Sequence, residues 1–255
     1  MDTARQRLLR GMPLHAITSA YGTDGLRDRF AAEIAGFPHP RQVRLAAALD
    51  LAARLHAADR RQQEPYLNHL LRVAIRILSH YEVQDADVAV AALLHDAVED
   101  HAVELAADGT GPAARAELTA DGTRQAALAA LAARFGGRVA DLVEAVTNPE
   151  YEPGRDRNQQ YREHVADSLD RSPWARIIKA SDFTDNGAGL IHTTGPEVER
   201  LAAKYAPLIP VLRDAVTRPD TPLSSAARQR ILAQLDRCAE RFAVILPPGP
   251  PPGNR

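Results

Sequence analysis

The sequence predicts an all-α protein, and three observations support that fold class. Ala, Leu and Arg, which favour helices, are abundant. Aromatic residues make up only 5% of the chain, and runs of alternating β-branched residues, which indicate strands, are few. With 255 residues, 45% hydrophobic and 25% charged, the chain has the length of one large domain or two small ones and the composition of a folded protein.

Apolar residues at helical spacing predict three helices in the first half of the chain, over residues 43–58, 66–80 and 85–100. Pro65 favours the start of the second helix, and Asp85 or Asp87 suits the N-cap of the third. Because the middle of the third helix is apolar nearly all round, we expect this helix to be the most buried.

The helical pattern continues through the second half of the chain. Helices are expected over residues 124–135, 138–146, 158–170, 173–186, 196–216 and 224–244. The Gly-rich segment 106–123 lacks a clear period and is interpreted as a loop that could act as a lid. The ending PPGPPPGNR is interpreted as a disordered, polyproline-type tail.

Charge and cysteine content restrict the partners and the compartment. The 31 Lys plus Arg residues nearly balance the 33 Asp plus Glu residues, for a formal net charge of -2, so no overall positive field attracts nucleic acid polymers or anionic membranes. The single cysteine, Cys238, cannot form an intramolecular disulfide, which favours a reducing cytoplasm. The apolar runs are too short for a membrane span, and the N-terminus lacks a secretory signal. Any nucleotide that the protein handles is therefore expected to be small.

The densest chemical signal is the run HDAVED at residues 95–100. By composition an HD pair is expected roughly 0.7 times in this chain, but HD followed by ED at this offset only roughly 0.003 times. In a continuous helix His95 and Glu99, like Asp96 and Asp100, lie four residues apart and share one face. Ionisable groups buried there need compensation, for which a divalent metal is the simplest candidate.

Two residues elsewhere could complete a metal site: His69, which follows EPYLN, and Asp182 in IIKASDFTDN. Two imidazoles and two carboxylates suit Mn, Fe, Zn or Mg and leave positions open for water and substrate, as in a hydrolytic site. Other interpretations stay open on the residues alone. His69 could be a core histidine, Asp182 a helix cap or a partner of Lys179, and the pair Glu99 and Asp100 a solvent-exposed helix end.

Four segments, in this order, resemble a known family. The segments RRQQEPYLNHLLRVA, AALLHDAVED, RFGGRVADLVEAVT and IIKASDFTDN are similar to the hydrolase domain of the RelA/SpoT homologue family, within the HD metal-dependent phosphohydrolase superfamily. The resemblance covers roughly residues 45–190, over half of the chain. It implies an all-helical HD-domain bundle that binds one Mn²⁺ and removes pyrophosphate from the 3′ position of ppGpp and pppGpp.

The resemblance also implies roles for individual residues. The positions that correspond to the metal ligands are His69, His95, Asp96 and Asp182. Glu99 and Asp100 correspond to the acidic pair that positions or activates the attacking water. Arg60 and Asn186 correspond to residues that contact the nucleotide. No role is assigned to the other histidines.

The chain departs from the family pattern at three places. Leu70 replaces the proline that usually follows the first metal histidine, residues 183–185 replace basic or polar residues, and Gly187-Ala188-Gly189 replaces a Met-Arg-Thr type run that contacts substrate. Recognition of the base and the phosphates is therefore expected to differ, which leaves an adenosine alarmone open as substrate. Only about 65 residues follow Leu190, so we expect a stand-alone hydrolase without a synthetase domain.

The sequence predicts four parts: an N-terminal helical extension (1–40), an HD phosphohydrolase domain (41–216), a C-terminal helix (217–246) and a Pro-rich tail (247–255). The predicted function is cytoplasmic, metal-dependent hydrolysis of ppGpp or pppGpp to GDP or GTP plus pyrophosphate. Two alternatives stay open: an HD phosphohydrolase acting on another nucleotide, such as ppApp or a nucleoside phosphate, and a non-catalytic nucleotide sensor. The oligomeric state is not predicted.

Overall fold

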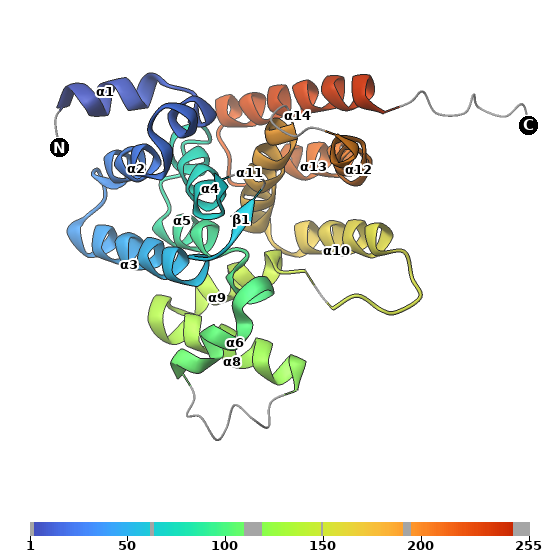
Figure 1. Ribbon diagram of the computed structural model, residues 1–255, viewed down its shortest axis with the longest axis horizontal. Helices are drawn as coiled ribbons and strands as arrows, with labels where there is room; N and C mark the ends of the chain where they lie inside the picture. The colour runs from blue at the N-terminus through green and yellow to red at the C-terminus, as the bar shows by residue number, and fades with distance from the viewer. Residues whose placement is uncertain (1–2, 62–63, 110–118, 149, 191–194, 247–255) are drawn as a thin grey trace, which may run out of the picture.

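The computed structural model describes residues 3–61, 64–109, 119–148, 150–190 and 195–246. Within these ranges the chain is almost entirely helical (Figure 1), which confirms the all-α prediction. The one sheet among them is an antiparallel pair of two-residue strands, β1 (Arg60–Arg61) and β2 (Glu64–Pro65). None of the helices described is both long enough and apolar enough to cross a membrane.

The helices are, in chain order, α1 (Thr3–Gly11), α2 (Leu14–Ile34), α3 (His39–Leu55), α4 (Leu67–Ser79), α5 (Ala86–Leu93), α6 (Ala97–Gly109), α8 (Ala120–Phe135), α9 (Gly137–Val146), α10 (Arg157–Arg171), α11 (Pro173–Gly189), α12 (Pro196–Tyr205), α13 (Leu208–Thr217) and α14 (Ser225–Ile245).

Helix α4 lies at the centre of the molecule and packs against α2, α5 and α11 (Figure 1). Every residue from Leu67 to Leu78 is buried, so the helix is covered on all sides and its polar side chains must find partners inside the protein. Buried apolar side chains from α1 to α14 form one cluster. The domain boundaries expected at residues 40 and 216 stay predictions.

The prediction of one helix over residues 85–100 is wrong in one respect, because the structure has two helices there. Asp85 caps α5 by accepting from the backbone N–H groups of Asp87 and Val88, as expected, but the helix ends at Leu93 and α6 begins at Ala97. The ring of His95 contacts the carbonyl of Ala92 at 2.9 Å, the group that a continuing helix would pair with a backbone N–H. The four-residue spacing across this break therefore does not define one helical face.

A second expected helix, 196–216, is also divided, because α12 ends at Tyr205 and α13 begins at Leu208. Pro207 lies in the gap and has no N–H with which to continue the hydrogen-bond ladder. The other helices match their expected ranges to within a few residues. Of the lid segment, residues 110–118 lie outside the described ranges and the flanks belong to α6 and α8; the tail 247–255 lies outside them too.

Gly187 has a packing role that explains part of the departure at residues 187–189. Helix α11 approaches α14 so closely that a Cβ atom at Gly187 would lie 2.8 Å from Cys238 Sγ and 3.5 Å from Phe242 Cζ. A Cβ atom at Gly189, two residues later, would meet nothing within 4 Å. The glycine at 187 therefore permits close contact between these two helices.

We expect Gly187→Val to lower the free energy of unfolding by about 1–3 kcal/mol, the usual cost of overpacking a core. Adding Cys238→Ala should recover part of the loss, because it removes the sulfur that the new side chain meets. Urea denaturation of the two variants measures both effects, with Gly189→Val as the matched control. An equal loss in Gly187→Val and Gly189→Val would contradict the packing explanation.

Candidate metal centre and active site

Four side chains from three parts of the chain converge at the centre of the bundle. His69 lies in the first turn of α4, His95 and Asp96 in the break between α5 and α6, and Asp182 on α11. Asp96 Oδ2 lies 3.1 Å from His95 Nε2 and 3.8 Å from His69 Nε2. Asp182 Oδ1 lies 3.3 Å from His69 Nε2 and 3.7 Å from His95 Nε2. The structure thus brings together all four residues that the sequence suggested as metal ligands.

Both imidazoles are held so that Nε2 faces the two carboxylates. His69 Nδ1 contacts Asp185 Oδ2 at 2.9 Å, and His95 Nδ1 contacts the carbonyl of Ala92. A ring nitrogen fixed in this way leaves the other nitrogen free to bind a cation, the arrangement usual for metal-binding histidines. The Nε2 atoms of His69 and His95 are buried and have no hydrogen-bond partner, so the donor set fits one divalent ion.

The charges at this centre favour a cation. Burial opposes ionisation of Asp96 and Asp182, yet the neighbouring imidazoles keep the pKa of each carboxyl below its usual range. Burial likewise lowers the pKa of His95, but Asp96 and Asp182 outweigh it and raise that pKa to about 10. A metal ion that binds at His95 Nε2 must therefore displace a proton from that imidazole.

Asp185, at a position where the chain departs from the family pattern, fixes His69. Its carboxylate, 3% exposed, accepts from Arg72 Nε at 2.9 Å and from Arg76 Nη2 at 2.9 Å, as well as facing His69. Burial would raise the pKa of Asp185, but Arg72, His69 and Arg76 hold it well below its usual range. The signal in the sequence is the spacing of Arg72 and Arg76, four residues apart in the run LLRVAIRIL, whose other residues are all apolar.

Two further side chains contact the carboxylates of the centre. Tyr66 donates from its hydroxyl to Asp96 Oδ2 at 2.7 Å. Asn186, assigned by resemblance to the nucleotide, donates from Nδ2 to Asp182 Oδ1 at 2.8 Å, while its own Oδ1 is buried and has no partner. Asn186 therefore orients a candidate ligand and still offers one acceptor atom.

The acidic pair lies on the first turn of α6, where Glu99 and Asp100 are exposed. Asn148 donates from Nδ2 to both carboxylate oxygens of Glu99, at 3.0 and 2.9 Å, and from its backbone N–H at 3.3 Å. Partial burial, followed by the charges of Asp96 and Glu99, raises the pKa of Asp100 to about 6. A carboxylate with a pKa near neutrality is suited to accept a proton.

A cavity of about 860 Å³ adjoins Glu99, within the size range of small-molecule sites. Asn148, Tyr151 and Arg157 line it among others, and the guanidinium of Arg157 lies 5.0 Å from the centre of the Tyr151 ring. Glu99 lines this cavity, whereas Asp100 and the four donors do not.

Cationic side chains gather around Asp182. Lys179 Nζ lies 3.9 Å from Asp182 Oδ2, and both Lys204 and Arg61 interact electrostatically with Asp182. Lys179 and Lys204 are the only lysines in the chain. Arg60, the residue assigned by resemblance, is exposed on β1, whereas its neighbour Arg61 lies with its guanidinium 6.0 Å from the Tyr66 ring centre.

One family of known proteins matches part of the chain. Residues 48–170 match the HD domain family, and the helical bundle and the His and Asp donors agree with this match. The matched segment includes three of the four donors and ends before Asp182.

Several curated proteins are similar to this chain in sequence. The chain is 34% identical over 144 residues to the mouse and human proteins named guanosine-3′,5′-bis(diphosphate) 3′-pyrophosphohydrolase MESH1, and 33% identical over 142 residues to the zebrafish protein of that name. The alignment with the mouse protein spans 55% of this chain and 65% of the relative. The chain thus matches slightly less than two thirds of the relative's length.

A solved structure has the same fold. It is described as a metazoan ortholog of SpoT that hydrolyzes ppGpp and plays a role in starvation responses. The superposition has a TM-score of 0.56 at 23% sequence identity and covers 80% of this chain and 97% of the other.

We expect His95→Ala and Asp182→Ala each to abolish stoichiometric binding of a divalent metal, because each removes one of only four protein donors. Metal content after dialysis and titration calorimetry measure the loss. His39→Ala, at an exposed position, is the control and should bind metal like the wild type. Affinity within about twofold of wild type in either variant would exclude that residue as a ligand.

Asp100→Asn should stabilise the metal-free protein above pH 6. Because the folded-state pKa of Asp100, about 6, exceeds its ordinary value of 3.8, the ionised carboxylate opposes folding above pH 6, and this penalty disappears below about pH 4. The difference in unfolding free energy between variant and wild type should therefore grow from pH 4 to pH 6.5 and then level off. Denaturant melts across this range, with Asp167→Asn as control, test it; a gain that is constant with pH would contradict it.

Proposed function

We propose that this protein is a metal-dependent phosphohydrolase that removes the 3′-pyrophosphate of ppGpp or pppGpp, with water as co-substrate and GDP or GTP plus pyrophosphate as products. The observation that carries the proposal is the pair of buried, unpartnered Nε2 atoms of His69 and His95, which face two carboxylates beside an exposed acidic pair. The names of the curated relatives support the choice of substrate.

The four donors would hold one divalent ion, which we propose to be Mn²⁺. When bound, such an ion supplies Lewis acidity toward phosphate oxygens and lowers the pKa of water. His69, His95, Asp96 and Asp182 bind it, and their own partners keep them oriented before the ion arrives. Preorganisation of this kind lowers the cost of assembling the site.

Glu99 and Asp100 act on the attacking water. Asn148 holds the Glu99 carboxylate in place through three hydrogen bonds, so Glu99 orients the water. Asp100, whose pKa of about 6 suits proton transfer near neutral pH, accepts the proton. The proton thus moves from water to the carboxylate as the oxygen of the water attacks phosphorus and the 3′ P–O bond breaks. The 3′ oxygen that leaves then takes up this proton, directly or through solvent, and becomes the 3′ hydroxyl of GDP or GTP.

The surrounding cations and the cavity accommodate the nucleotide. Lys179, Lys204 and Arg61 place positive charge near Asp182, where they neutralise the pyrophosphate that leaves. The cavity beside Glu99 holds the rest of the nucleotide. Arg60 and the free Oδ1 of Asn186 stay proposed substrate contacts. We place the reaction in the cytoplasm, on the support of the single buried Cys238.

Purified protein loaded with Mn²⁺ should convert ppGpp to GDP and pyrophosphate, because one site provides the metal donors, the acidic pair and the phosphate cations. Chromatography and phosphorus NMR identify the products. We expect kcat/KM for ppGpp and ppApp to differ by less than about a hundredfold, because residues 187–189 carry no bidentate base-reading side chain. A difference above about 10⁴ would instead demonstrate a dedicated base contact.

The control separates chemistry from metal binding. Glu99→Gln should keep stoichiometric metal and lose about 10²-fold or more in kcat, the scale of a positioned acid or base. Turnover of ordinary nucleoside phosphates but not of alarmones would identify a different HD phosphohydrolase. Tight binding of ppGpp without turnover would identify a nucleotide sensor.

A further inference from the structure

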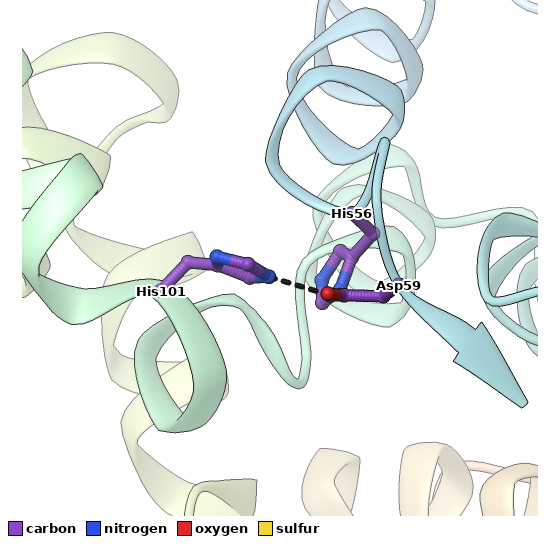
Figure 2. Close-up of side chains that lie close together, drawn as sticks. All are labelled: His56, Asp59 and His101. Atoms are coloured by element: carbon purple, nitrogen blue, oxygen red, sulfur yellow. Dashed lines mark hydrogen bonds and ion pairs between the residues drawn. The ribbon is translucent and has the colours of Figure 1, made fainter.

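His56, Asp59 and His101 form a second cluster of histidine and aspartate (Figure 2). His56 caps the C-terminus of α3, Asp59 immediately precedes β1, and His101 reaches across from α6. Asp59 Oδ2 lies 2.7 Å from His56 Nδ1 and 2.7 Å from His101 Nε2, and the two imidazole rings are nearly perpendicular with centres 4.5 Å apart. The function proposed above uses none of these residues.

The spacing of the donor atoms indicates hydrogen bonds at this cluster and not metal coordination. Ligands bound at about 2.1 Å lie roughly 3 Å or more from one another, and the four contacts of the first centre measure 3.1–3.8 Å. Both contacts of Asp59 measure 2.7 Å, the length of a hydrogen bond between an imidazole N–H and a carboxylate. Asp59 therefore accepts from both rings at one oxygen.

The contact between Asp59 and His56 connects the cluster to the metal centre. The ring of His56 is stacked on the ring of Tyr66, with centres 4.8 Å apart and planes 13° apart, and the Tyr66 hydroxyl donates to Asp96 Oδ2 at 2.7 Å. The backbone adds a second link, because the N–H of Tyr66 donates to the carbonyl of Asp59 at 3.1 Å. Asp59 thus restrains the aromatic ring that orients a candidate metal ligand.

The contact between Asp59 and His101 connects the cluster to the acidic pair, Glu99 and Asp100. His101 directly follows Asp100, and its backbone, at φ -133° and ψ 31°, interrupts α6 one residue after that pair. The side chain of His101, the residue at this interruption, is the one that donates to Asp59. The turn that carries Glu99 and Asp100 is therefore attached to the segment before β1 as well as to its own helix.

We propose that Asp59 is a positioning residue that keeps the acidic pair in register with the metal ligands, through His101 on one side and through His56 and Tyr66 on the other. Its effect on catalysis rests on the proposed function. Its effect on the geometry of the metal centre does not, since that effect follows from the contacts with His56 and Tyr66 alone.

The experiment compares Asp59→Ala and Asp59→Asn with wild type and with Asp236→Ala. Asp236 is the matched control, because its carboxylate also joins two helices, through Arg213, but outside the site. At a temperature where all variants are folded, Asp59→Ala should weaken Mn²⁺ affinity about tenfold and lower kcat for ppGpp at least tenfold, with KM changed less than about twofold. Asp59→Asn keeps an acceptor oxygen and should recover much of the Mn²⁺ affinity.

Two readouts distinguish positioning from a general loss of stability. In a cycle with Tyr66→Phe, the effects of Asp59→Ala on Mn²⁺ affinity should be non-additive, because both act on Asp96. Nitrogen-15 NMR should show a proton on His56 Nδ1 and on His101 Nε2 in the wild type and faster exchange of both protons in Asp59→Ala. Neither readout requires turnover, so both decide the role of Asp59 even if ppGpp is not the substrate.

Three results would overturn the proposal. The first is Mn²⁺ affinity and kcat in Asp59→Ala that both equal those of Asp236→Ala. The second is strict additivity in the Tyr66→Phe cycle. The third is a stoichiometry of two Mn²⁺ ions per chain with the second lost in His101→Ala, which would make the cluster a metal site instead of a hydrogen-bonded bridge.

Discussion

The contact between Asp185 and helix α4 is the constraint on which the rest of the site depends. A carboxylate buried on α11 accepts from Arg72 and Arg76 and faces the Nδ1 of His69. Removing either side of a buried, multiply paired charge leaves an uncompensated ion, at a cost of several kcal/mol. The relative position of α4 and α11 is thereby set, and with it the distance between His69 and Asp182.

This constraint explains why ionisable groups are tolerated so deep in an α-helical core. Each carboxylate at the centre has a specific donor: Asp185 has its arginines, Asp182 has Asn186, and Asp96 has Tyr66. Among the buried atoms left without a partner are the ones that a cation would use, the two Nε2 atoms. Hydrogen-bonded carboxylates that face unpartnered imidazole nitrogens are typical of a site organised before its ligand binds.

Most of the fold could be predicted from the sequence, because helical periodicity and capping residues are local signals. The break at Leu94 to Asp96 could not, since no Gly or Pro is present there and the interruption depends on the environment of His95. The four donors could be found because HDAVED and EPYLNH are dense and improbable runs. Asp185 and Asp59 were missed, because the partner of a supporting carboxylate is decided by tertiary packing and not by spacing along the chain.

The break between α5 and α6 couples the binding of an ion at His95 and Asp96 to the orientation of α6. Two donors, His95 and Asp96, lie in the linker between α5 and the turn that bears Glu99 and Asp100. Anything that restricts the backbone of this linker also restricts the direction of α6, and the relation is reciprocal by thermodynamic linkage. Whatever effect an ion held by His95 has on the affinity for a ligand held by Glu99, that ligand therefore has the same effect on the affinity for the ion.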